Sequence, residues 1–241
     1  MDNSFSPSTY FSLPFRLSGS VLKVVAVIAM TLDHVAYFLM SPEYPFYDIM
    51  RCIGRIAFPV FALLIAEGFA HSGNRLRYFV TLFAFGIFSE LPWYLLNGID
   101  GSHNVMFTLA IGVLALCLFD RLCEHKILAL FAVSLLCFLS YWIGVDYDWK
   151  GIAVIVIFYI LRHRTIWPWL QNTRINFFSQ SLLQVTFIFP LIYFYGLIGA
   201  ILASVIILFY DGSRGFIRGK ICKYAFYAFY PIHLYLLYLL V

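Results

Sequence analysis

The chain has 241 residues, of which 63% are hydrophobic and only 12% are charged, and its mean hydropathy is +0.88. Soluble domains carry about 25% charged residues, so this composition excludes an ordinary soluble protein. The formal net charge of +4 comes with no basic run interleaved with aromatic residues, which argues against a nucleic-acid partner. Because one crossing of a lipid bilayer takes about 20 apolar residues, the chain has room for about eight or nine spans.

Apolar runs bounded by charges, Gly or Pro follow one another along the chain. They cover residues 20–40, 52–70, 77–96, 104–119, 127–143, 151–161, 181–195, 197–210 and 224–241. The run at 151–161 is short, and the two runs around Gly196 could form one broken helix. We predict an all-α polytopic transmembrane helix bundle of about 8–9 spans, a single integral membrane domain over residues 1–241 with a short polar N-terminal tail at 1–19.

Several common sequence signals are missing. The N-terminal tail lacks the basic region, short apolar core and small-residue cleavage site of a secretory signal, so we expect the first helix to remain in the mature protein. The five cysteines are scattered without CxxC or zinc spacing, and no two histidines stand one helical turn apart. The sequence therefore predicts no metal site, and no Gly-rich phosphate loop or GxSxG elbow indicates nucleotide binding or hydrolase chemistry.

The positive charges fall in alternate connections between the runs. One set of connections holds Arg16 and Lys23; Arg75 and Arg77; Arg121 and Lys126; Arg162, Arg164 and Arg174; and Arg214, Arg218, Lys220 and Lys223. The other set is acidic or balanced, as in Asp146 and Asp148 with Lys150. Because cytoplasmic loops carry an excess of Lys and Arg, nine spans predict a cytoplasmic N-terminus and a C-terminus outside.

Ionisable side chains within the spans are costly, and they usually mark a functional site or its support. Asp33 and His34 lie about two-thirds along the first span, and Arg51 and Arg55 stand one turn apart at the start of the second. Adjacent helix positions point about 100° apart, so Asp33 and His34 cannot both face one neighbour squarely. We expect the arginines to have a carboxylate partner, for which Asp33 and Glu90 are the candidates.

Two interpretations of these polar groups stay open. They could form a salt-bridge network that locks the helices together, which we favour for Arg51 and for Glu67, which shares a face with His71 at the inner end of the second span. They could instead form a functional site near the outer aqueous face, which we favour for Asp33, His34 and Arg55. His233, in the last span, could act chemically or simply donate to a backbone carbonyl.

Several motifs resemble the TraX family of membrane proteins, named for the F-pilin acetylation protein of conjugative plasmids. The first span reads LKVVAVIAMTLDHVAYFL, the second RCIGRIAFPVFALLIAEGF, the third FGIFSELPWYLL, the fourth HNVMFTLAIGVLAL and the last YAFYPIHLYLLYLL. Their order is similar to that of the family over most of the chain. From about Cys123 to Asp211 the similarity is only in the apolar spans and a Tyr-Asp-Trp-Lys-Gly segment, where the family often has a Tyr-Gly turn.

The resemblance implies a multi-pass protein of the bacterial cell inner membrane that N-acetylates a pilin subunit from acetyl-CoA, in pilus or fimbria biogenesis or conjugation. A fimbrial subunit or a surface glycan is a further possible acceptor. A different class of function is a non-enzymatic membrane assembly factor for pili or fimbriae, in which the polar groups only hold helices together. A small-solute transporter ranks last, because no internal repeat is visible.

Acetyl transfer needs a base, and His34 has a natural pKa near working pH. Asp33 would orient or balance it, His233 would be a second base, and Arg55 with Asn104 would stabilise the oxyanion. Asn104 and Glu90 are our candidate substrate contacts. For the CoA phosphates we expect contacts from the inner-face arginines, which could equally serve only membrane orientation. These are Arg75, Arg77, Arg162 and Arg164.

Overall fold

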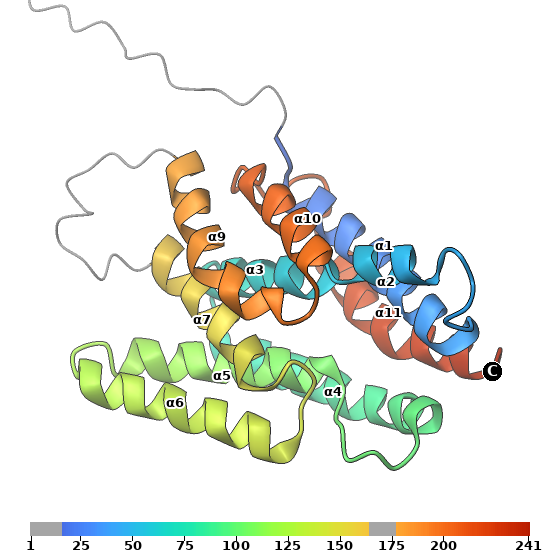
Figure 1. Ribbon diagram of the computed structural model, residues 1–241. Helices are drawn as coiled ribbons and strands as arrows, with labels where there is room; N and C mark the ends of the chain where they lie inside the picture. The colour runs from blue at the N-terminus through green and yellow to red at the C-terminus, as the bar shows by residue number, and fades with distance from the viewer. Residues whose placement is uncertain (1–15, 164–176) are drawn as a thin grey trace, which may run out of the picture.

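The computed structural model describes residues 16–163 and 177–241, and this part of the chain is helical apart from its connections (Figure 1). The helices are α1 Gly19–Leu39, α2 Tyr47–Gly54, α3 Ala57–Ala70, α4 Arg75–Asn97, α5 Val105–Arg121, α6 Lys126–Ile143, α7 Asp148–His163, α9 Phe177–Tyr193, α10 Leu197–Leu208 and α11 Lys220–Tyr238. The all-α helical bundle is thus confirmed. Most of the predicted polar tail, residues 1–15, lies outside the described residues.

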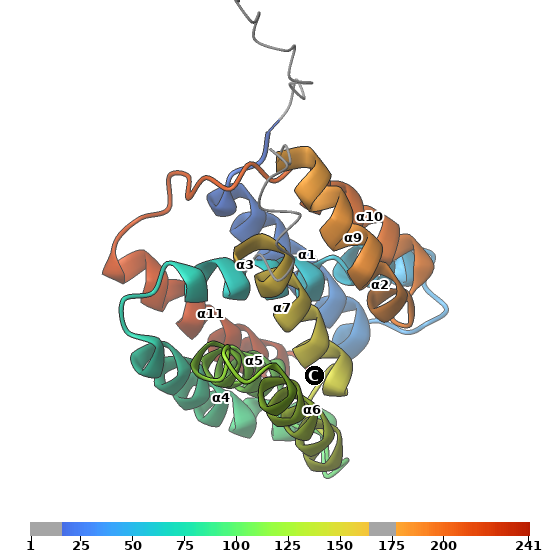
Figure 2. The ribbon, with the colours of Figure 1, turned by 90° about the vertical axis from the view of Figure 1, so that its left-hand side faces the viewer.

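Helix α3 lies in the middle of the bundle (Figure 2). The other helices form a ring in which each contacts the next, in the order α1, α11, α4, α5, α6, α7, α9, α10, α2 and back to α1. Over their most apolar stretch, 56% of the residues of the α2–α3 segment are buried, against 11% in α6. Glu67, near the end of α3, is therefore buried among the helices.

The second apolar run differs from its prediction, because it starts earlier and is broken. Its helix begins at Tyr47, and a turn at Arg55 and Ile56 separates α2 from α3. Pro59 explains the break: it has no N–H to donate to the carbonyl of Arg55, and its ring crowds that carbonyl. The sequence Gly-Arg-Ile-Ala-Phe-Pro therefore places Arg55 at a helix end inside the bundle.

The two runs around Gly196 form a hairpin of separate helices rather than one broken helix. Helices α9 and α10 contact each other along their length, and the turn between them closes through backbone bonds from Tyr195 and Gly196 to the end of α9. Gly196 has a φ of 127°, a conformation that favours glycine. The hairpin brings the start of α10 onto α2.

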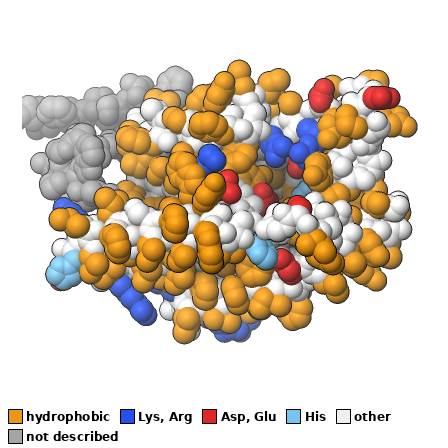
Figure 3. Space-filling model, turned by 60° about the horizontal axis from the view of Figure 1, so that its bottom comes forward, with side chains coloured by type: hydrophobic (Ala, Val, Ile, Leu, Met, Phe, Trp, Pro, Cys, Tyr) orange, Lys and Arg blue, Asp and Glu red, His pale blue; other side chains and the backbone are white. Residues whose placement is uncertain are grey.

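The surface of the bundle is largely apolar (Figure 3). Within the described residues, four segments are long and apolar enough to cross a membrane: Gly19–Leu39, Tyr47–Ala70, Arg75–Asn97 and Lys126–Ile143. On α6, Ile127 is 87% exposed and Trp142 is 76% exposed. Such a surface is stable in contact with lipid and unstable in contact with water. The chain is therefore a membrane protein.

Gly54 allows α1 and α2 to approach, because a Cβ at this position would overlap the side chain of Asp33. We expect Gly54→Val to lower the free energy of unfolding by about 1–3 kcal/mol through overpacking. The measurement is the thermal denaturation midpoint of the detergent-purified protein. Gly73→Val is the matched control, since a Cβ added to Gly73 would have no neighbour within 4 Å. Equal midpoints for the two variants would contradict the close approach.

Candidate functional site

His34 and His233 meet between α1 and α11, with His34 Nδ1 and His233 Nε2 2.7 Å apart. His233 is buried, and its Nδ1 lies 3.0 Å from the backbone oxygen of Phe229. A carbonyl can only accept, so His233 Nδ1 carries a proton and, in the neutral ring, its Nε2 accepts. His34 Nδ1 must then donate, which leaves the lone pair of His34 on Nε2. The pair thus fixes the tautomer of a half-buried base.

Asp33 faces a different neighbour, as the 100° separation of adjacent positions predicts. Its Oδ2 pairs with Arg51 Nη1 at 2.9 Å, and the Arg51 guanidinium also lies over the ring of Tyr37, 4.7 Å from its centroid. For Arg51 the predicted carboxylate partner is therefore confirmed as Asp33 and not Glu90, whereas the prediction is wrong for Arg55, which has no carboxylate within ion-pair distance among the described residues. It also follows that His233, rather than Asp33, orients His34.

Arg55 is held at the α2–α3 break by close packing against α10. A Cβ added to Gly199 would overlap the Arg55 side chain and would come 3.0 Å from the carbonyl oxygen of Cys52. Within the described residues, the Arg55 guanidinium has no hydrogen bond and no carboxylate within ion-pair distance, although its charge acts on Asp33 and Asp146. An enclosed arginine with free donors is suited to an anionic or oxyanionic group.

The α6–α7 loop lies near Arg55 and contributes Asp146 and Tyr147 to the site. No function was predicted for this loop. Asp146 is tied to the α4–α5 loop by its backbone N–H, which donates to the His103 carbonyl at 2.9 Å. Tyr147 stacks on Phe58 of α3, with ring centroids 3.8 Å apart, and its carbonyl accepts from the Tyr195 hydroxyl at 3.1 Å. In the sequence, the Tyr-Asp-Trp-Lys-Gly segment could have indicated that this loop belongs to the site.

The backbone of this loop is strained. Tyr147 and Asp148 have φ values of 64° and 47°, which non-glycine residues adopt only when the surroundings impose them. Strain of this kind concentrates at functional sites. Here it turns the chain at the start of α7, so that Asp146 comes within the electrostatic reach of Arg55.

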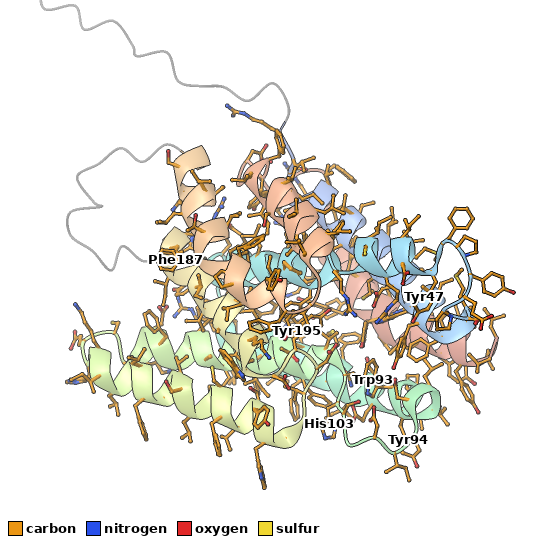
Figure 4. The ribbon with its side chains drawn as sticks, in the orientation of Figure 1. Tyr47, Trp93, Tyr94, His103, Phe187 and Tyr195 are labelled. Carbon is orange, nitrogen blue, oxygen red and sulfur yellow. The ribbon has the colours of Figure 1, made fainter. Side chains whose placement is uncertain are left out.

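Glu90 and Asn104 form a separate group near the α4–α5 loop. Glu90 pairs with His103 and accepts from the Asn104 amide at 2.6 Å, while the same amide donates to the Gly86 carbonyl at 2.9 Å. Asn104 Oδ1 caps α5. Both amide hydrogens are therefore engaged, which corrects the predicted oxyanion role of Asn104. Glu90 stays a candidate substrate contact, because with Trp93, Tyr94 and His103 it lines a cavity of about 310 Å³ (Figure 4).

Two of the four predicted CoA-binding arginines pair with carboxylates at the inner end of the bundle. Arg162 pairs with Glu67 of α3, which also lies 3.4 Å from His163 Nε2. Arg75 pairs with Asp120 at 2.6 Å, and Asp120 accepts from the Tyr159 hydroxyl at 2.8 Å. Because both carboxylates are buried, Arg75 and Arg162 act first as structural counter-charges, and this corrects their predicted role.

The other two predicted phosphate contacts differ. Arg77 is exposed and donates to the Tyr224 hydroxyl at 3.3 Å, without an ion pair among the described residues. It stays available to a ligand. Arg164 lies outside the described residues.

Arg162→Met should remove the arginine partner of the buried Glu67 and leave only His163 and His71 near its carboxylate. We expect a loss of about 3–5 kcal/mol of stability, because removing one partner of a buried ion pair costs far more than replacing both. The measurement is the denaturation midpoint in detergent at neutral pH. The double variant Glu67→Gln/Arg162→Met should recover much of the loss, and a single variant as stable as the wild type would show that the pair is solvated.

Asp146 makes stability depend on pH. The residue lies in a loop, and loss of hydration raises the pKa of its carboxyl group to about 7, although the backbone N–H of Tyr147 and the charge of Arg55 oppose the shift. An unfolded aspartate titrates near about 3.9, so the folded state holds this proton more tightly and stability should fall as pH rises from about 4 to about 7. Asp146→Asn should weaken the dependence of the denaturation midpoint on pH across this range. An unchanged pH dependence would contradict the raised pKa of Asp146.

Comparisons with known proteins agree with these motifs. The chain matches the TraX protein family over residues 18–241. It is 31% identical over 230 residues to the probable fimbrial assembly protein FimC, serogroup H1, of Dichelobacter nodosus, covering 87% of this chain and 90% of that protein. It is 28% identical over 150 residues to an uncharacterized protein of Rickettsia prowazekii (strain Madrid E), covering 59% and 55% of the two chains. No solved structure matches. The chain belongs to the TraX family.

Proposed function

We propose that this protein is a membrane-embedded acetyltransferase that transfers the acetyl group of acetyl-CoA to the N-terminal amine of a pilin or fimbrial subunit. The observation that carries the proposal is the His34–His233 pair, which leaves a basic nitrogen, His34 Nε2, in a shielded part of the bundle. A purely structural histidine does not need its second nitrogen presented in this way. Arg55, whose charge acts on the neighbouring Asp33, supplies free hydrogen-bond donors.

Acetyl transfer uses these groups in a simple order. The acceptor nitrogen forms a bond to the thioester carbonyl carbon while His34 Nε2 takes its proton. Negative charge develops on the carbonyl oxygen, and Arg55 stabilises it. The C–S bond then breaks, and the protonated His34 returns the proton to the leaving thiolate. The products are the acetylated amine and free CoA, and no other reactant is needed.

The remaining polar groups position this machinery. The Arg51–Asp33 pair joins α2 to α1 beside His34. It therefore fixes the spacing between these two helices. His233 acts as a positioning residue through its bond to His34 rather than as a second base. Glu90 at the nearby cavity is our candidate contact for the acceptor.

Relatives support the biological setting. The D. nodosus relative carries the name of a fimbrial assembly protein, and it is aligned with most of this chain. We therefore propose a role in pilus or fimbria biogenesis, in the bacterial inner membrane. From the basic connections we also propose a cytoplasmic N-terminus and a C-terminus outside. In this orientation the histidine pair would lie toward the outer side, where a translocated subunit presents its N-terminus.

The alternative is a non-enzymatic assembly factor, in which the polar groups only lock helices together. The buried Glu67–Arg162 and Asp120–Arg75 pairs fit that role. Arg55, which lacks a carboxylate partner among the described residues, does not. The two functions differ in whether the fibre subunit carries a new acetyl group.

We expect His34→Ala to lower acetylation by about 10²–10⁴-fold, the usual contribution of a general base. Mass spectrometry of surface-fibre subunits from cells with and without the chain measures the N-terminal acetyl group. His125→Ala, in the exposed α5–α6 loop, is the matched control, and both variants must reach normal membrane levels.

Three outcomes separate the functions. Loss of the acetyl mass without the chain and with His34→Ala supports the acetyltransferase. Fibres that fail to assemble without any acetyl change support the assembly factor. Full acetylation by His34→Ala at normal levels would exclude His34 as the base.

A further inference from the structure

A group of positive side chains without carboxylate partners lies where α1, α4 and α11 begin. Lys23 of α1 is half-buried, and the charges that act on its ammonium group are both positive, from Arg214 and Lys223. No described carboxylate lies within ion-pair distance of these three groups or of Arg77. We call Lys23, Arg77, Arg214 and Lys223 the inner basic cluster.

The cluster is built into the fold. The α10–α11 connection runs past the start of α1 (Figure 2), where the Ser20 hydroxyl donates to the Arg214 carbonyl at 2.8 Å and accepts from the Ile217 N–H at 2.7 Å. Asp211 is a carboxylate in the same connection, but it forms no ion pair with these cations, and its Oδ1 accepts a hydrogen bond from the Ser213 N–H at 2.7 Å. Hydrogen bonds of the Ser20 hydroxyl thus hold the connection that carries Arg214 beside the start of α1, where Lys23 lies, and like charges held together in this way attract a ligand of opposite charge.

Aromatic rings hold the other two cations of the cluster. Lys223 Nζ lies 5.5 Å from the Tyr78 ring centroid and 5.8 Å from that of Tyr227, and Arg77 donates to the Tyr224 hydroxyl at 3.3 Å. These contacts join the first turns of α4 and α11. Arg77, Arg214 and Lys223 remain exposed, and Lys23 is half-buried within reach of the charges of Arg214 and Lys223.

The cluster is in line with the histidine pair. Lys23 and His34 are eleven residues apart on α1, which is about 16 Å along the helix and within about 20° of whole turns, so they share a face. That face is turned to α11, because His34 contacts His233. On α11, Lys223 and His233 are ten residues, or about 15 Å, apart. An extended ligand bound at the cluster would therefore reach His34.

We infer that the inner basic cluster binds a phosphate-bearing ligand whose remaining chain extends along α1 toward His34. A CoA thioester has this chemistry, with phosphates at one end of a long flexible arm and the reactive group at the other, and in this form the inference rests on the proposed function. An anionic phospholipid has the same phosphate chemistry. Both bind through charge-assisted hydrogen bonds to Lys and Arg.

The test measures binding of unacylated CoA, which needs no acceptor and no reaction. Full-length protein in nanodiscs of phosphatidylcholine alone is titrated with CoA, and we expect Lys23→Gln and Arg214→Gln each to raise the Kd about tenfold or more. Lys23→Arg should restore most of the affinity. Arg121→Gln, exposed at the end of α5 on the same side of the bundle, should leave it unchanged.

A second arm uses nanodiscs with added phosphatidylglycerol and no CoA, with the denaturation midpoint as the readout. Loss of CoA binding in the cluster variants supports the donor as the ligand. Unchanged CoA binding with loss of stabilisation by phosphatidylglycerol supports a lipid headgroup. A wild-type protein that responds to neither probe, or variants that match the wild type with both, would overturn the inference.

The variants should fold, because removing Lys23 relieves repulsion from Arg214 and Lys223. Without ligand, Lys23→Gln should therefore be at least as stable as the wild type, whereas a structural role predicts the opposite. Intact CoA binding without acetyl transfer to the fibre subunit would reject the proposed function and keep the binding site.

Discussion

A charge inside an apolar bundle must be neutralised by another helix or held for a ligand, because lipid and packed side chains offer it no hydration. This constraint sorts the charged groups of the described chain. Five carboxylates in this part of the chain are paired: Asp33 with Arg51, Glu67 with Arg162, Glu90 with His103, Asp120 with Arg75 and Asp148 with Lys150. Among the described residues, Arg55 is enclosed by helices without a carboxylate partner, and the inner basic cluster gathers like charges around the half-buried Lys23. These two places are where we propose that a ligand brings the missing negative charge.

Features that depend on one helix could be predicted from the sequence. The apolar runs gave the helices, and the fixed angle between neighbouring positions predicted that Asp33 and His34 face different partners, as the bonds to Arg51 and His233 show. Arg51 and Asp33 are close in sequence and at one depth, so Asp33 was one of the two predicted candidates, and the structure selects it. The break at Arg55 was missed, although Pro59 lies four residues later and accounts for it.

Features that depend on contacts between distant segments could not be predicted. The excess of Arg and Lys on one side indicates orientation, but it does not show which of these charges a carboxylate neutralises. Arg75 and Arg162 looked like phosphate ligands because Asp120 and Glu67, their partners, are far away in sequence. Asp146 looked like an ordinary loop charge, because only the turn at Tyr147 brings it near Arg55.

The hydrogen bonds between the start of α1 and the α10–α11 connection also affect how a donor and an acceptor could meet. Backbone bonds from Leu17 and Asp211, at 2.8 and 3.0 Å, join the chain before α1 to the end of α10, and Ser20 continues this contact to Arg214. The register of α1 against α11 is thereby fixed at the inner end, and the His34–His233 bond fixes it again toward the outer end. With both ends fixed, the distance from the inner basic cluster to His34 cannot vary freely. The length of the ligand's arm, and not only its charge, then decides which group is presented to the base.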